Sequence, residues 1–488
     1  MSSEFLDSDF PTFRRMWRSI KTAIRAVFNR RVALRLLAII AVLFVVHAML
    51  MVVWGRQLEA RFAQLRARGE PLNGIDLARR VPDSENGAVV YEKVFAALKA
   101  AGVPLWSSGL LDVTTTAKDR AALEPEARKA IAARASVFPL IEEGARKPKC
   151  VFPVRWQDGA DALFPHTSGL RETCRVVSLK AIIDARDGKV DAALKDVTLG
   201  LKVSRALEKE PGLISYLTRI SCTKMITGGL REATRSRSLS ISQARRMYDE
   251  VGDISLAEGF VLAMQGERTF INWCFDTIRT GSFLRASAGS FKKVSYTIRR
   301  YLWRPISYKD QMVAMDVIDR QMRRAKLPYR QALTPIRSSE NGGLNWFDVT
   351  ADRILFWAFL PDIPPSYESC DNALCVPRYA MLTRFLASAH YSTLQGRDSA
   401  MAELGLGQVA MALKAYKSEF GAYPASLKDL KTKLSWRLPD DPFTGKPFVY
   451  KRAGHGFLLY SWGPDLKDDH GKQREAPGDG DQTWVSEI

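Results

Sequence analysis

The feature that most constrains this chain is an uncharged, apolar run close to its start. Residues 36–54 are 19 consecutive positions without Asp, Glu, Lys or Arg, and His47 is the one residue among them with an ionisable side chain. As a helix the run rises about 28 Å, close to the ~30 Å hydrocarbon core of a bilayer. A buried core helix is the alternative. Apolarity on every side and a basic flank favour a single N-terminal transmembrane helix.

The segment before this run is basic and amphipathic. In a helix over residues 11–30, one stripe is apolar and cations lie beside it, which is typical of helices that lie on anionic membranes. The positive-inside rule places residues 1–35 in the cytoplasm and the rest of the chain across the inner membrane, in the periplasm. A cleaved signal peptide is less favoured, because no small-residue cleavage site follows Trp54. The predicted membrane-surface residues are Arg14, Arg15, Trp17, Arg18, Lys21 and Arg25.

Residues 55–395 predict an α-helical extracytoplasmic domain. Apolar residues recur at helical spacing over 170–187, 190–209 and 213–235, with Gly188-Lys189 and Pro211-Gly212 as turns. Short turns between helices of similar length predict a bundle or a repeat-like stack. Further helices are predicted at 56–69, at 125–144 with a kink at Pro139, and at 241–253, 255–280 and 376–392.

The net charge of +19 suggests acidic partners, such as phospholipid head groups. Residues 291–305 contain no acid, and aromatic residues lie between their cations; the residues concerned are Lys292, Lys293, Arg299, Arg300, Arg304, Tyr296, Tyr301 and Trp303. Two interpretations stay open. The segment docks on head groups or an acidic partner, or it is a solvated helix face with its aromatic side chains in the core. No nucleic-acid-binding motif accompanies the charge, so nucleic acid is not expected as a partner.

Residues 396–488 predict a small α+β domain. Leu406, Val409, Leu413 and Tyr416 form the apolar face of a helix, and Gly421 ends that helix because glycine adopts the left-handed conformation without steric cost. Strand-forming residues at 448–451 and 457–461 flank the turn 454–456. This pattern predicts an antiparallel β-hairpin.

Three stretches carry a resemblance to a known family: A-Y-K-S-E-F-G-A-Y-P at 415–424, L-P-D-D-P-F-T-G-K-P-F-V-Y at 438–450, and L-L-Y-S-W-G-P-D at 458–465. Together they resemble the C-terminal half of the major pseudopilin of type II secretion systems. The whole chain resembles a family of uncharacterised bacterial, planctomycete-type membrane-anchored proteins with this pseudopilin-like end. The N-terminus lacks the short Gly-ended leader and the following helix with Glu at its fifth position, so leader processing is not implied. A true pseudopilin with an atypical leader stays an alternative.

The same resemblance implies one Ca²⁺ in the loop after the hairpin. It places Asp465, and one of Asp479 and Asp481, at ligand positions, with the backbone carbonyl of Trp462 as a third ligand. Aspartates in glycine-rich loops supply the oxygen ligands that Ca²⁺ prefers. The alternative is a mobile acidic tail.

The six cysteines and five histidines carry no enzymatic signature. Cys370 and Cys375 enclose four residues, which is short enough for a loop-closing disulfide, whereas Cys150, Cys174, Cys222 and Cys274 are expected to be free, mostly buried thiols. No histidine has a metal-ligand neighbour three or four residues away, and no nucleophile elbow, Walker A loop or dinucleotide fingerprint occurs.

The sequence therefore predicts a non-enzymatic, single-pass inner-membrane protein with an extracytoplasmic interaction or assembly domain. Its expected partners are membrane lipids and an envelope protein, and the resemblance associates it with a type II secretion or pseudopilus-like apparatus. The rival hypothesis is an envelope hydrolase whose dispersed carboxylates line a groove in the helical body, since glycosidase carboxylates can lie far apart in sequence.

Overall fold

The computed structural model describes residues 30–101, 117–235, 239–281, 290–332, 380–472 and 480–485. The helices are α2 (Arg30–Ala67), η1 (Gly74–Leu77), α3 (Gly87–Ala100), α4 (Ala117–Ala132), η3 (Ala135–Val137), α5 (Phe138–Arg146), η4 (Trp156–Asp161), α6 (Pro165–Arg186), α7 (Val190–Arg205), α8 (Leu213–Arg235), α9 (Ile241–Gly252), α10 (Ala257–Thr280), α11 (Ser290–Arg324), α12 (Tyr329–Ala332), α14 (Met381–Phe420) and α15 (Lys428–Leu434). The strands are β1 (Val449–Ala453), β2 (Gly456–Ser461) and β3 (Gln482–Val485).

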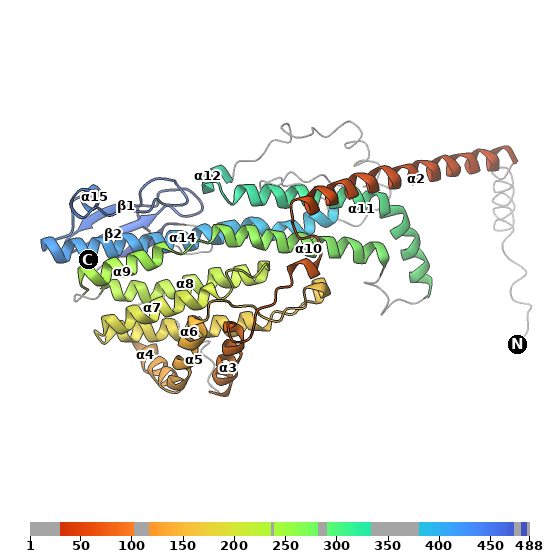
Figure 1. Ribbon diagram of the computed structural model, residues 1–488. Helices are drawn as coiled ribbons and strands as arrows, with labels where there is room; N and C mark the ends of the chain where they lie inside the picture. Colours follow the sequence, from red (N-terminus) through yellow and green to blue (C-terminus); the bar gives the residue numbers. More distant parts are fainter. Residues whose placement is uncertain are drawn as a thin grey trace, which may run out of the picture.

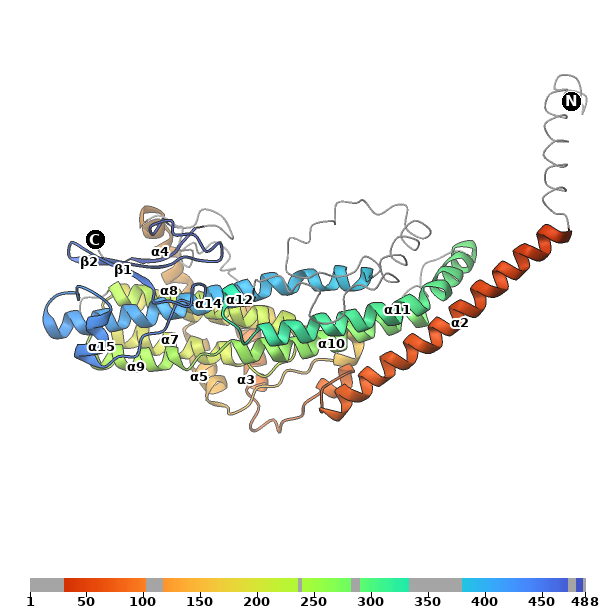
Figure 2. The ribbon, with the colours of Figure 1, turned by 90° about the horizontal axis from the view of Figure 1, so that it is seen from above.

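The molecule is elongated and mainly helical, as predicted (Figures 1 and 2). The first half of α2 projects from one end, and the sheet lies at the opposite end. The long helices α10, α11 and α14 run between these ends, with α6, α7 and α8 packed along one side. The sheet and the apolar projection are therefore held apart by the full length of the helical body.

Helices α6, α7 and α8 form a close-packed layer because small residues lie where they meet. A Cβ on Gly200 of α7 would lie 2.0 Å from Ile226 Cδ1 of α8, and one on Gly229 of α8 would lie 2.7 Å from Ala181 Cβ of α6. The turn between α6 and α7 uses Gly188, whose φ of +74° favours glycine. The three helices predicted at 170–187, 190–209 and 213–235 are confirmed.

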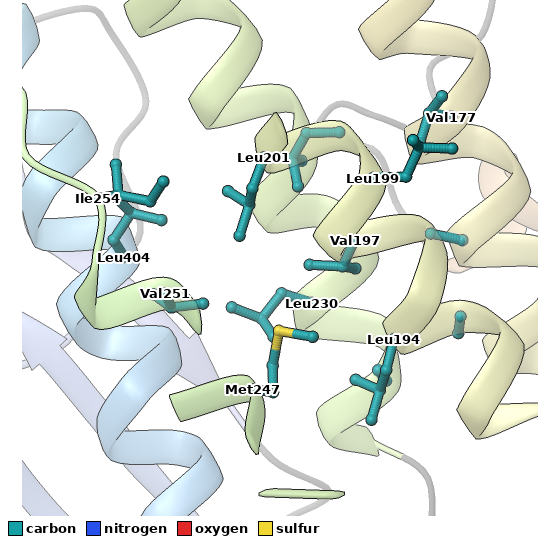
Figure 3. Close-up of a cluster of buried hydrophobic side chains, with 14 of the residues drawn as sticks. Val177, Leu194, Val197, Leu199, Leu201, Leu230, Met247, Val251, Ile254 and Leu404 are labelled. Atoms are coloured by element: carbon teal, nitrogen blue, oxygen red, sulfur yellow. The ribbon is translucent and has the colours of Figure 1, made fainter. Parts of the chain in front are cut away.

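One apolar core joins this layer to α9 and α14. Figure 3 shows Leu230 of α8, Met247 and Val251 of α9, and Leu404 of α14 converging with Val197 of α7. The helix α14 runs without interruption through the predicted boundary between residues 395 and 396. Residues before and after this boundary thus contribute to a single core. The division of the chain into two domains at this point stays a prediction.

The sheet is antiparallel, with strand order β1-β2-β3. Tyr450 of β1 pairs with Leu459 of β2, which confirms the predicted hairpin, and Leu459 pairs in turn with Trp484 of β3. Strand β3 was not predicted. It fixes the sheet to α8, because Trp484 is buried, its Nε1 donates to Thr234 Oγ1 at 3.2 Å, and Arg231 lies over its ring.

Two helix predictions were wrong in detail. The helix predicted at 125–144 is broken rather than kinked, because Pro139 lies in the first turn of a new helix, α5, where the missing N–H costs nothing. The helix predicted at 376–392 and the one that follows it are a single helix, α14. Gly396 lies inside it and costs about 1 kcal/mol relative to alanine, which burial of the flanking turns offsets.

Candidate functional site

Within the described ranges, α2 is the one helix long and apolar enough to cross a membrane. Most of its large apolar side chains between Leu34 and Val53 are 46–62% exposed, and no part of the apolar window is buried in the protein. A core helix would be covered by its neighbours, so most of the surface of this half of α2 lacks a protein environment. The predicted surface residues Arg14, Arg15, Trp17, Arg18, Lys21 and Arg25 lie outside the described residues.

The second half of α2 is clamped to the body. Arg61 Nη2 lies 2.5 Å from Asp319 Oδ2 of α11, and Arg268 Nη2 of α10 lies 2.8 Å from the other oxygen of the same carboxylate. Arg268 is 1% exposed and also pairs with Glu70, just beyond α2. Leu58 and Leu65 are buried in the same region. A buried arginine shared by two carboxylates from different elements fixes the angle between α2 and the body.

At the opposite end, the loop after β2 returns to the start of β3. We call residues 462–471 and 480–481 the tip loop. Gly463 has a φ of +73°, and a Cβ on it would lie 2.7 Å from the backbone oxygen of Gly480. Glycine is therefore required at 463 for its conformation and for the close approach of the two ends of the loop.

The first turn of the tip loop is tied to the neighbouring loop. Ser461 Oγ donates to Asp441 Oδ1 at 2.8 Å and accepts from the amide of Gly463 at 3.2 Å. Burial raises the pKa of Asp441, and the amide of Phe443 opposes that rise. The hydroxyl of Tyr329, on α12, donates to the carbonyl of Pro464 at 3.2 Å. These contacts hold the loop in place from two sides.

Three aspartates of the loop, Asp465, Asp468 and Asp481, each use one carboxylate oxygen to order the loop. Asp468 Oδ1 accepts from Tyr460 Oη and from the amide of His470. Asp465 Oδ1 accepts from the amide of Lys467 at 3.2 Å, and Asp481 Oδ2 accepts from the amide of Gly471 at 2.7 Å. Such bonds fold a loop around its own carboxylates.

The remaining oxygens provide a test of the predicted Ca²⁺ site. Asp465 Oδ2 and Asp481 Oδ1 are buried and accept no hydrogen bond from the described residues. Burial raises the pKa of Asp481 to about 6, and the nearby charges of Asp468 and Asp469 add to the rise. A buried anion without a counterion is costly, so each of these oxygens is a candidate ligand for a hard cation.

The predicted ligand set is only partly described. Trp462, Asp465 and Asp481 lie in the tip loop, whereas Asp479 lies outside the described residues. In the part of the chain that the structure covers, no group of three or more His, Cys, Asp or Glu side chains is placed to hold a metal ion. A complete Ca²⁺ site here therefore needs oxygen ligands besides the two described carboxylates, such as backbone carbonyls.

The cysteine predictions have mixed outcomes. Cys370 and Cys375 lie outside the described residues, so their disulfide stays a prediction. Cys150, Cys174, Cys222 and Cys274 are free thiols, as expected, with Cys174 and Cys222 fully buried between α6 and α8. Burial, and then the neighbouring Cys222, raise the pKa of Cys174. These thiols therefore pack as small apolar side chains rather than as nucleophiles.

Three described carboxylates, Asp249, Glu250 and Asp253, line an open surface hollow along α9 beside Arg245 and Arg246, whereas the buried Asp196 is held in an ion pair. Asp196 pairs with Lys180 at 2.6 Å, and burial raises its pKa to about 6. Surface hollows of about 490, 270 and 260 Å³ lie along α9, beside the first turn of α10, and next to β1, and Asp196 lines none of these three.

One buried polar cluster resembles a catalytic constellation by composition only. His166 Nε2 lies 2.8 Å from Glu210 Oε1, and Ser215 Oγ donates to the same oxygen. The serine therefore bonds the carboxylate and not the imidazole, which is not the order that activates a nucleophile. His166 also stacks on Phe152, with ring centroids 4.2 Å apart. The cluster is a satisfied polar centre of the core.

Comparison of the chain with protein-family models, curated proteins and solved structures finds no match. The candidate site consequently depends on the geometry of the tip loop and of α2.

Two features of these regions were missed at the sequence level. His47 has a partner on α11, described below. Asp310 of α11 accepts from the amides of Leu382 and Thr383 and so caps the first turn of α14. The partner of His47 lies 254 residues away in sequence, and those of Asp310 lie about 72 residues away. No local sequence pattern predicts contacts over such separations.

Proposed function

We propose that the protein is a single-pass inner-membrane protein that presents an interaction or assembly surface in the periplasm. The apolar half of α2 spans the bilayer, the basic residues 1–35 remain in the cytoplasm, and the helical body carries the sheet away from the membrane. The sequence resemblance of residues 415–465 supports a place beside a type II secretion or pseudopilus-like apparatus. No hydrolase is proposed, because the hollow lined by Asp249, Glu250 and Asp253 is open to solvent and the buried Asp196 is paired with Lys180.

The observation that carries this proposal is the division of α2 into two halves. The first half exposes bulky apolar side chains over most of its surface, and the second half is bound to α11 by the partly buried ion pair between Arg61 and Asp319, a carboxylate that also holds Arg268 of α10. An apolar helix without protein cover favours lipid as its surroundings. The clamp joins that helix rigidly to a body whose sheet lies at the far end (Figure 2).

Topology mapping in membrane vesicles tests the anchor and its orientation. Single cysteines introduced at Ser2 and at His455, in a background where reaction of the native thiols is measured separately, are probed with a membrane-impermeant maleimide. We expect position 455 to react from the periplasmic side only, and position 2 only after the membrane is opened. Equal labelling of both positions from one side would contradict the proposed topology.

The tip loop, on this proposal, is ordered by Ca²⁺ held by Asp465 and Asp481 together with the carbonyl of Trp462. The two unpaired buried oxygens support it. The cation would neutralise the buried charge of Asp481 and fix the surface that a partner meets.

Thermal unfolding of the full-length protein in detergent tests the metal. Ca²⁺ is expected to raise the melting temperature relative to chelator, and Asp481→Asn is expected to abolish the difference. Asp440→Asn is the matched control, because Asp440 is an exposed acid of the same region that the site does not use. A melting temperature that is the same with Ca²⁺ and with chelator would contradict the metal without affecting the anchor.

A further inference from the structure

His47, in the apolar half of α2, has a specific partner on α11. Its ring stacks on Tyr301 with centroids 4.8 Å apart, and its Nε2 lies 3.0 Å from the backbone oxygen of Tyr301. A carbonyl oxygen only accepts, so Nε2 must carry the proton. Nδ1 has no hydrogen-bond partner among the described residues.

The carbonyl of Tyr301 needs this donor because of Pro305. In an α-helix, the oxygen of residue 301 accepts from the amide of residue 305, and proline has no N–H. In lipid, an unpaired carbonyl costs several kcal/mol, since no water is present to replace the missing donor. His47 therefore supplies from α2 the hydrogen bond that α11 cannot make within itself.

The contacts between α2 and α11 show that the helices run in the same direction. His47 meets Tyr301, a Cβ on Gly55 would lie 3.7 Å from Tyr308, and Arg61 pairs with Asp316. His47 lies seven residues before Trp54, which is about 10 Å of helical rise inside the apolar run. Tyr301 thus lies at the same depth, well inside the end of the run that faces the body.

The surface of α11 next to this contact combines apolar and basic side chains. Ile298, Tyr301 and Leu302 are 55%, 41% and 40% exposed, and Arg304 is exposed beside them. The first part of α11 bends away from the line of α2 (Figures 1 and 2). Exposed apolar side chains next to cations are typical of helices that lie in the interface of an anionic bilayer.

We propose that the first half of α11, from Ser290 to Arg304, enters the leaflet that faces the body and contacts anionic phospholipid. The inference rests on the proposed function, because α2 defines where the bilayer lies. The apolar surface of α11 continues that of α2 through the His47–Tyr301 contact, and residues 291–304 carry Lys and Arg without any Asp or Glu. The protein then contacts lipid through two elements rather than one.

Photo-crosslinking of the full-length protein tests this. Benzoylphenylalanine is placed singly at Ile298, Leu302 and Leu37, in vesicles of phosphatidylglycerol and phosphatidylcholine, and lipid adducts are measured by mass spectrometry. Ile214 and Phe420 are matched controls on the body, because they are 54% and 46% exposed. We expect adducts at Leu37, Ile298 and Leu302 several-fold above the two controls.

The outcomes separate the two proposals. Adducts at Leu37 with control-level signals at Ile298 and Leu302 overturn the inference and leave the anchor intact. Control-level signals at Leu37 overturn the anchor and the inference together. Adducts of Ile298 with protein instead of lipid also overturn the inference, since they assign the surface to a protein partner.

Discussion

The helices α2 and α14 are nearly equal in length, 38 and 40 residues, yet they have opposite surroundings. Leu43 of α2 is 62% exposed, whereas Leu404 of α14 is 2% exposed and its neighbours Leu406 and Val409 are fully buried. Both helices are rich in apolar residues. Apolar composition alone therefore does not decide whether a long helix enters a protein core or a bilayer.

The difference lies in small residues and charges. In α14, Gly405 and Gly407 leave room for Phe448 and Leu230, whose atoms come within 2.8 and 2.5 Å of where a Cβ would be. Arg397 and Asp398, also in α14, form an ion pair at 2.8 Å in the core. The apolar run 36–54 of α2 has mostly branched side chains and no formal charge, so it offers little close packing surface, and the polar partner it offers to another element is His47.

The largest expected effect comes from placing charge in the exposed half of α2. Leu43→Asp with Val46→Asp should cost about 5–8 kcal/mol of insertion free energy, because each Asp near the centre of a span costs ~2.5–3.5 kcal/mol and each lost apolar residue adds a few tenths. The variant should be released by alkaline extraction of membranes. Its circular dichroism in detergent should match the parent, and retention in the membrane pellet would contradict the comparison.

The next largest effect is expected from shortening a buried side chain of α14. Leu404→Ala should lower the free energy of unfolding by about 2–5 kcal/mol, because it leaves a cavity between α14 and α9. The matched control is Leu43→Ala in α2, which should change it by less than about 0.5 kcal/mol. Near-ultraviolet circular dichroism during thermal unfolding in one detergent measures both, and equal shifts would show that the two helices share one environment.

The contact between His47 and the carbonyl of Tyr301 predicts a specific non-additivity. His47→Leu should weaken the α2–α11 pair by about 1–3 kcal/mol, because the carbonyl is left without a donor. In a Pro305→Ala background the same change should cost clearly less, since the amide of residue 305 then serves Tyr301. Unfolding of the four variants in the same lipid environment measures the coupling; additive effects would contradict it.

The smallest expected effect concerns the N-terminus of α14. Burial raises the pKa of Asp310 to about 6, above the ~3.9 of an unfolded aspartate, so the folded protein retains this proton longer. Stability from this group is therefore greatest below about pH 4 and decreases as the pH rises from about 4 to 6. Asp310→Asn should flatten that dependence and cost about 0.5–2 kcal/mol for the lost cap acceptor. Thermal unfolding between pH 4 and 7 compares the two proteins.

Local patterns predicted the local elements. The charge-free run predicted the first half of α2, the apolar spacing 406–416 predicted the buried face of α14, and Gly421 ends that helix with a φ of +75°. The hairpin followed from its strand formers and central turn. In each of these, a few neighbouring residues carry the whole physical reason.

Features that depend on distant partners were not predictable in this way. Strand β3 is fixed by Arg231 and Thr234, about 250 residues before Trp484. The role of His47 was not predictable because its partner, the carbonyl of Tyr301, lies on α11. That carbonyl lacks a helical donor because residue 305 is a proline. At the tip loop, the sequence supplied the aspartates, but only burial shows that Asp465 and Asp481 each keep an unpaired oxygen.

On the proposed function, the ion pair between Arg61 and Asp319 makes α2 a lever as well as an anchor. A helix of 38 residues is about 57 Å long, and the tilt of such a helix in a bilayer adjusts to the thickness of the hydrocarbon core. If the joint with α11 keeps its angle, a change of tilt turns the whole body. The height and direction of the sheet would then follow membrane thickness, and the distance at which the sheet meets a neighbouring protein would depend on the membrane as well as on the protein.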